Sequence, residues 1–192
     1  MALNRRHKNK QKKMKRRFIF RTTTLIVISA AIIYALFMNI TNDGSNIKAG
    51  NKAPDFQLTQ VNDNNGKNYI QLSELEGKGV LLNFWASYCK PCESQLSYME
   101  ALYSEYHDDI ELIAINLDNS ELVARQFANR LNLSYPVAHD SRSEIMNMYS
   151  VSPIPATFFI DAEGKVTEEV VGSMSYINLE NHIEKILPAQ GE

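Results

Sequence analysis

The sequence predicts a three-layer α/β domain with a central β-sheet, beginning near Gly50. Three nearly continuous apolar runs, 80–85, 110–117 and 156–161, have the composition of strands that are covered on both faces. Between the first two runs, apolar residues recur at helical spacing over 91–106. Buried strands that alternate with amphipathic helices predict a sheet packed between two layers of helices.

Shorter elements complete the predicted domain. Strands near 56–61 and over 69–72 flank the turn-forming sequence Asn-Asp-Asn-Asn-Gly, so we expect a hairpin at an edge. Ser120 is a residue type that caps helix N-termini, so we expect a helix to begin there. The remaining expected elements are helices 120–131, 143–149 and 177–187 and strands 136–138 and 165–171.

Charge divides the chain into two parts. The 192 residues include 20 Lys and Arg and 22 Asp and Glu, and 44% are hydrophobic, which is a globular composition. The first 42 residues hold ten of the basic residues and no acid, whereas the remaining 150 have a formal charge of −12. The two parts are therefore physically different.

The N-terminal part has the pattern of a membrane anchor. A basic tail, 1–17, precedes a mainly apolar stretch, 18–40, which contains one charged residue, Arg21. Its uncharged part, 22–38, would be about 26 Å long as a helix, close to the thickness of a bilayer core. The basic flank predicts a cytoplasmic N-terminus, with the linker 41–49 and the domain 50–192 on the outer face of the cell membrane.

Two other interpretations of this part are weaker. A cleaved signal peptide would need a small-x-small site after the apolar run, where Phe-Met-Asn-Ile stands instead. A basic arm that binds nucleic acid would leave the apolar stretch unexplained. We therefore expect an uncleaved, single-pass signal anchor and no nucleic-acid partner.

The chemistry is predicted at the sequence Cys89-Lys90-Pro91-Cys92, between the first buried strand and the long helix. Two cysteines three residues apart in a first helical turn can form a disulfide. Unpaired N–H groups at a helix N-terminus stabilise a thiolate, Lys90 adds a positive charge, and Pro91 suits the first turn. We expect Cys89 to be the exposed nucleophile and Cys92 the resolving thiol.

Structural roles for the two cysteines are less favoured. A disulfide that closes a four-residue loop gains little by loop entropy. A structural zinc site needs about four ligands, and this chain offers one cysteine pair, so we expect no metal site. A redox-active dithiol accounts best for cysteines at this place in the fold.

Three segments together resemble a known family. Residues 83–92, Asn-Phe-Trp-Ala-Ser-Tyr-Cys-Lys-Pro-Cys, resemble the active-site segment of thioredoxin-fold thiol–disulfide oxidoreductases. With Gly-Asn-Lys-Ala-Pro-Asp-Phe at 50–56 and Ile-Pro-Ala-Thr-Phe at 154–158, they look like the membrane-anchored ResA/TlpA group of the redoxin superfamily. The resemblance implies a thioredoxin fold with an N-terminal hairpin and a central strand–helix insertion.

The resemblance also implies roles for residues outside the cysteine pair. It implies that the Ile154–Pro155 bond is cis and faces the sulfurs, with Pro153 as the alternative cis proline. Ile154 and Pro155 would then bind an extended substrate segment through exposed backbone. Trp85 is either a core aromatic or a shield for the disulfide.

Departures from the family pattern affect the proton route to Cys92. Thioredoxin has an acidic residue at the position of Asn83, where the ResA group has asparagine, and the ResA group has a glutamate at the position of Gln95. Tyr88 and Ser97 also replace the usual tryptophan and proline. Because neither Asn83 nor Gln95 titrates, we expect slower and less pH-dependent exchange than in close relatives, with Glu93 or water carrying the proton.

The predicted function is the reduction of protein disulfides outside the cytoplasm. The family resemblance implies apocytochrome c as a substrate, a membrane electron-transfer protein as reductant, and no cofactor beyond the Cys89–Cys92 disulfide. An oxidase that introduces disulfides is the main alternative, because the direction depends on reduction potential. A thiol peroxidase would need a threonine where Ala86 stands, and a non-enzymatic membrane-tethered adaptor is the third alternative.

Overall fold

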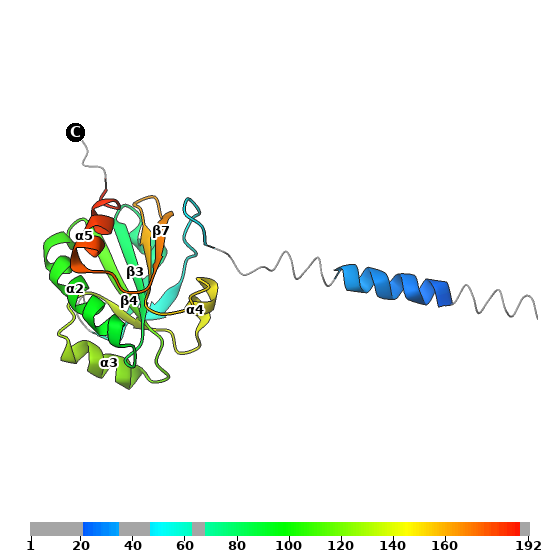
Figure 1. Ribbon diagram of the computed structural model, residues 1–192, viewed down its shortest axis with the longest axis horizontal. Helices are drawn as coiled ribbons and strands as arrows, with labels where there is room; N and C mark the ends of the chain where they lie inside the picture. The colour runs from blue at the N-terminus through cyan, green and yellow to red at the C-terminus, as the bar shows by residue number, and fades with distance from the viewer. Residues whose placement is uncertain (1–20, 35–46, 63–67, 189–192) are drawn as a thin grey trace, which may run out of the picture. The chain divides into compact units, whose positions relative to one another are not determined.

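The computed structural model describes residues 21–34, 47–62 and 68–188, and the chain forms two compact units, 1–43 and 44–192. In the first unit, residues 21–34 are helical and nearly all their side chains are exposed. No helix within the described ranges is long and apolar enough to cross a membrane. The predicted tail, both ends of the predicted anchor and most of the predicted linker lie outside the described residues (Figure 1).

A five-stranded mixed sheet forms the centre of the second unit. Its strand order is β5-β4-β3-β6-β7, with β3, β4 and β5 parallel and β6 and β7 antiparallel to their neighbours. The strands are β3 (Gly79–Trp85), β4 (Ile110–Asn116), β5 (Val137–His139), β6 (Ala156–Ile160) and β7 (Val166–Val171). The predicted α/β domain with a central sheet is therefore confirmed.

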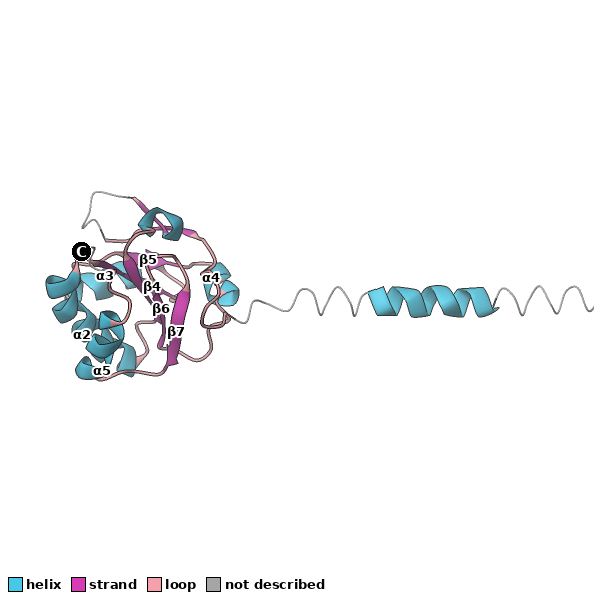
Figure 2. Cartoon of the chain, turned by 90° about the horizontal axis from the view of Figure 1, so that it is seen from above, coloured by secondary structure: helices cyan, strands magenta, loops and turns pink. Residues whose placement is uncertain are grey.

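Helices cover both faces of this sheet. They are α2 (Lys90–Tyr106), α3 (Glu121–Arg130), α4 (Glu144–Met148) and α5 (Tyr176–Glu184). Helices α2, α3 and α5 lie on one side of the sheet and α4 on the other (Figure 2). Because successive strand residues point to opposite faces, Leu81 and Trp85 pack with α2, whereas Leu82 and Phe84 pack with α4.

A small hairpin precedes the sheet. Strands β1 (Gln57–Thr59) and β2 (Tyr69–Gln71) pair antiparallel, and the 3₁₀-helix η1 (Leu72–Leu75) follows. Leu72, predicted at the end of the strand, instead begins η1, because its side chain is buried and Asp55 accepts a hydrogen bond from the backbone N–H of Ser73. Between β4 and β6 the chain adds α3, β5 and α4, which include the expected strand–helix pair.

The register of the sheet brings two turns together at one end of the strands. In the parallel pair β3–β4, Trp85 is the partner of Asn116, so both strands end at the same level. In the antiparallel pair β3–β6, Phe84 is the partner of Ala156, which places Pro155 level with Trp85. The segment that carries Cys89 leaves the sheet at this end, together with the turn that follows β4.

Candidate active site

The cysteine pair lies where β3 gives way to α2. Cys89 is the N-cap of α2, with extended backbone angles of φ −89° and ψ 100°, and Pro91 stands in the first turn. Proline suits this turn because the first N–H groups of a helix have no intrahelical partner. The strand and the helix therefore fix both ends of the segment that carries the two sulfurs.

The two cysteines form a disulfide in this turn. Their Cα atoms are 5.3 Å apart, and the Cys89 Sγ accepts a hydrogen bond from the Cys92 backbone N–H at 3.3 Å. Both cysteines belong to the buried core, so Cys89 is less exposed than the sequence predicts; at 9% it is still more exposed than Cys92, at 1%. Once the disulfide is reduced, a thiolate at Cys89 would keep the N–H of Cys92 and the end of the α2 dipole as its partners.

The residues between the cysteines face solvent. Pro91 is exposed, and the Lys90 side chain is 93% exposed, with its Nζ 3.9 Å from Glu93 Oε2. Glu93 also pairs with Arg130 on α3, at 3.2 Å. Because the Lys90 ammonium is surrounded by water, its electrostatic support for a thiolate is screened, so the turn of the helix itself provides the main stabilisation.

Trp85 and the Ile154–Pro155 segment lie at the same end of the sheet. Trp85 is fully buried in the apolar cluster that includes both cysteines, and its ring centroid lies 5.0 Å from that of Phe127. The Ile154–Pro155 bond is cis, and the Ser152–Pro153 bond is cis as well. Pro155 is buried, whereas Ile154 is partly exposed.

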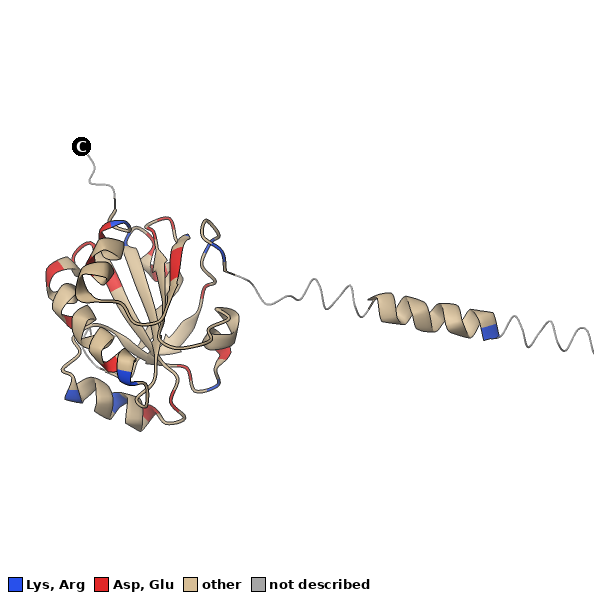
Figure 3. Ribbon diagram, in the orientation of Figure 1, with Lys and Arg blue, Asp and Glu red and all other residues tan. Residues whose placement is uncertain are grey.

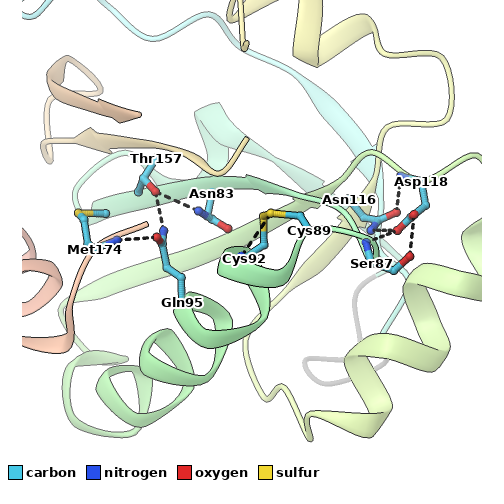
Figure 4. Close-up of a disulfide and its surroundings, with 9 residues drawn as sticks. All are labelled: Asn83, Ser87, Cys89, Cys92, Gln95, Asn116, Asp118, Thr157 and Met174. Atoms are coloured by element: carbon cyan, nitrogen blue, oxygen red, sulfur yellow. Dashed lines mark hydrogen bonds between the residues drawn. A yellow bond between two sulfur atoms is a disulfide. The ribbon is translucent and has the colours of Figure 1, made fainter. Parts of the chain in front are cut away.

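A buried amide network supports the first turns of α2. Asn83 Nδ2 and Gln95 Nε2 both donate to Thr157 Oγ1, at 2.9 and 2.8 Å, and Gln95 Oε1 accepts from the Met174 N–H at 3.0 Å. Asn83, Gln95 and Thr157 are fully buried. Figure 4 shows the Asn83 side chain between Thr157 and the disulfide. None of the three side chains titrates, so the network supplies position rather than a proton.

A second polar cluster lies on the other side of the disulfide, and sequence reasoning missed it. Ser87 donates to the carboxylate of Asp118 through both its N–H and its hydroxyl, and Asn116 Nδ2 donates to the same carboxylate at 2.7 Å (Figure 4). Polar residues directly after two buried strands, Ser87 after β3 and Asp118 after β4, were a usable signal, because the carboxyl ends of parallel strands meet at one end of the sheet.

A cavity in the domain lies away from the cysteines. It has a volume of about 260 Å³, and its lining includes Ala53, Leu72, Val80 and Ile160. Val80 and Ile160 pair near the start of β3, the end away from Cys89. Within the described ranges there is no group of three or more His, Cys, Asp or Glu side chains that could hold a metal ion.

This fold and this site together define a class of protein. A disulfide at the start of a helix, between a cysteine that is 9% exposed and one that is 1% exposed, is the arrangement of a dithiol that exchanges with other disulfides. The protein is therefore a thiol–disulfide oxidoreductase.

Comparisons with known proteins identify the family. The AhpC/TSA family matches residues 49–169. The chain is 41% identical over 191 residues to the thiol-disulfide oxidoreductase ResA of Oceanobacillus iheyensis, covering 99% of this chain and 100% of that one. It is 37% identical over 177 residues to ResA of Geobacillus kaustophilus, covering 92% and 99%. The chain belongs to the ResA group of thiol-disulfide oxidoreductases within the AhpC/TSA family.

Solved structures share the same fold. A Chlorobium tepidum protein described as a thiol:disulfide interchange protein DsbE superposes with a TM-score of 0.68 and is 30% identical, covering 73% of this chain and 99% of that one. StoA of Bacillus subtilis, at 24% identity, superposes with a TM-score of 0.58 and covers 67% and 96%. The domain is a thioredoxin fold.

Proposed function

We propose that this protein reduces protein disulfides, with Cys89 as the attacking thiolate and Cys92 as the resolving thiol. The observation that carries the proposal is the unequal exposure of the two residues in one helical turn, 9% for Cys89 and 1% for Cys92. A substrate sulfur can approach Cys89 from outside, whereas Cys92 is covered and reacts within the molecule.

The reaction proceeds in two exchanges. Cys89 Sγ forms a bond to one substrate sulfur as the substrate S–S bond breaks, and the departing sulfur takes a proton. Cys92, after losing its proton, attacks Cys89 Sγ, which closes the Cys89–Cys92 disulfide and releases the second substrate thiolate. The substrate gains two electrons, and its two sulfurs take up, through solvent, the two protons that Cys89 and Cys92 lost on ionising. A dithiol donor then reduces the enzyme again, and no cofactor takes part.

The location and partners in this proposal come from the N-terminal sequence and the family. We place the domain on the outer face of the cell membrane, held by an uncleaved signal anchor over 18–40. Apocytochrome c is the proposed substrate, and a membrane electron-transfer protein is the proposed reductant. Edman sequencing of the mature protein tests the anchor, because a mature N-terminus near residue 40 would contradict it.

The chemistry of the proposed function is tested by trapping. Cys92→Ser should accumulate a mixed disulfide through Cys89 when the reduced variant meets a peptide that contains a Cys-x-x-Cys-His disulfide, because no internal thiol is left to resolve it. Mass spectrometry of the adduct measures the result. The matched control, Cys89→Ser, should trap nothing, and equal trapping by both variants would contradict the assigned roles.

A further inference from the structure

A carboxylate holds the loop that carries Cys89. Ser87 lies two residues before Cys89, and its N–H and hydroxyl donate to the two oxygens of Asp118, at 2.9 and 2.8 Å. Asp118 stands in the turn after β4 and is 8% exposed. This two-point contact joins the β3–α2 turn to the β4–α3 turn, and the Leu117 N–H strengthens the junction by donating to Trp85 O at 2.9 Å.

Asp118 is also held in place by hydrogen bonds that do not involve Ser87. Asn116 Nδ2 donates to Asp118 Oδ2 at 2.7 Å, and Asn116 Oδ1 accepts from the Asp118 N–H at 3.0 Å. A ring nitrogen of His139 lies 2.7 Å from Asp118 O. The carboxylate thus accepts three hydrogen bonds in a nearly buried site, which fixes its orientation and offsets the cost of burying its charge.

The Ser87–Asp118 contact matters most when the disulfide is reduced. In the oxidised protein, the bond to Cys92 fixes the Cys89 sulfur at the end of α2. After reduction that bond is gone, and Cys89 must stay at the N-cap through its backbone, including its N–H bond to Ala86 O at 3.1 Å. A thiolate gains from the helix N-terminus only within the first turn, so a loop that moves loses that stabilisation.

We propose that Asp118 is a positioning residue for the nucleophile, and that it acts through Ser87 to keep the Cys89 thiolate at the N-terminus of α2. The inference rests on the proposed role of Cys89. It gives Asp118 no contact with substrate: its role is to define where the attacking sulfur lies in the reduced enzyme.

The charges around Cys89 make Ser87→Ala the informative substitution. The substitution removes no ionisable side chain, because Lys90 and Glu93 on α2, Arg130 on α3, His139 on β5 and Asp118 are all retained. A change in thiolate reactivity then reports the geometry of the loop. Replacing Asp118 first would also remove a negative charge, which favours a thiolate and opposes the geometric effect.

The experiment follows alkylation of Cys89 by iodoacetamide as a function of pH, in the full-length reduced chain carrying Cys92→Ser. Ser87→Ala should move the midpoint of the rate profile to higher pH and lower the rate at pH 7 roughly threefold to tenfold, the effect of losing one hydrogen bond. Ser87→Thr, which keeps the hydroxyl, should restore the profile. A midpoint that does not move in Ser87→Ala would overturn the inference.

The chain offers a matched control. Ser134 donates its N–H and hydroxyl to the carboxylate of Glu100, at 2.7 and 2.6 Å, which is the same contact at a place away from the cysteines. Ser134→Ala should leave the alkylation midpoint where it is in the parent. A shift equal to that of Ser87→Ala would mean a general loosening of the fold and would contradict the proposal.

Two further readouts keep the test decisive. The cycle of Ser87→Ala with Asp118→Asn is a second test, because residues that act through one contact give non-additive effects on the rate. Additive effects would contradict the proposal. Alkylation of Cys89 needs no substrate, so it is independent of the disulfide-reduction assay. If Ser87→Ala shifts the alkylation midpoint but the wild-type protein reduces no disulfide, the proposed function is refuted and the positioning role stands.

Discussion

At the scale of single residues, two buried amide side chains, Asn83 and Gln95, lie beneath the active site. Gln95 lies three residues after Cys92, fully buried, and links α2 to Thr157 and to the Met174 N–H. A glutamate there could keep the bond from Met174 and accept one from the Thr157 hydroxyl. The site therefore has room for a carboxyl group in the same place.

We predict that Gln95→Glu speeds disulfide exchange and adds a titration to its pH profile. Burial raises the pKa of an introduced carboxyl, so the group would exchange protons closer to neutral pH and could serve Cys92. Stopped-flow exchange with a model disulfide measures the rate. Gln126→Glu, on the exposed face of α3, is the control. An unchanged rate in Gln95→Glu would contradict this role.

The cysteine pair and its place in the fold could be predicted from local sequence, because a strand, a turn and a helix start follow one another directly. The contact between Ser87 and Asp118 could not, because its two ends belong to different turns and meet only once β3 and β4 are paired. The spacing of residues in the sequence indicates which residues are close along the chain, whereas this contact depends on how β3 and β4 are aligned in the sheet.

At the scale of elements, the N-terminal hairpin is tied to β5 by a buried asparagine. Asn62 Nδ2 donates to Tyr135 O and Asn62 Oδ1 accepts from the Val137 N–H, both at 2.8 Å. The Val61 N–H adds a bond to Val137 O. The sequence predicts only a turn role for this asparagine, because its second role depends on a partner more than seventy residues later in the chain.

We predict that Asn62→Ala lowers the free energy of unfolding by about 2 to 4 kcal/mol, because it leaves buried backbone groups of two residues without partners. Urea denaturation of the variant measures the change. Asn68→Ala, at an exposed position on the other side of the hairpin, should change it little. Equal stability of the two variants would show that Asn62 does not hold the hairpin.

The boundaries of helices and strands agree with the prediction where the apolar residues follow a single clear pattern, either a continuous run or helical spacing. The apolar runs and the stripe over 91–106 correspond closely to β3, β4, β6 and α2. Ser120 is the N-cap of α3 as predicted, yet its side chain makes no capping hydrogen bond. The residue type favours a cap, but the hydrogen bond depends on a side-chain rotamer that the sequence pattern does not define.

At the scale of the whole molecule, buried tyrosines in an acidic domain determine how the stability of the fold depends on pH above neutrality. Acidic residues are spread over the helices, the loops and β7 of the domain (Figure 3). Burial, followed by the charge of Glu100, raises the pKa of Tyr135, whose hydroxyl donates to Leu96 O. Burial, followed by Asp55, raises the pKa of Tyr149, whose hydroxyl donates to Pro54 O.

We predict that stability is lost on the alkaline side. Both tyrosines stay neutral in the folded protein, whereas in the unfolded chain they ionise at their ordinary pKa of 10.0. The contribution of these two tyrosines to the free energy of unfolding is therefore fully present below pH 10 and falls as pH rises above it. Phenolate absorbance followed together with circular dichroism measures this. Ionisation of Tyr135 and Tyr149 before any loss of structure would contradict their burial, and Tyr135→Phe should lessen the alkaline loss.

The central claim, that this oxidoreductase works as a reductant, is tested most directly by the reduction potential of the Cys89–Cys92 pair in the full-length chain. Equilibration against redox buffers, with the thiols quantified by alkylation, gives the value. We predict a potential near or below about −270 mV, the thioredoxin range, at which the dithiol gives electrons to protein disulfides. A potential near about −120 mV, the range of strong oxidants, would contradict the claim and make disulfide introduction the better account.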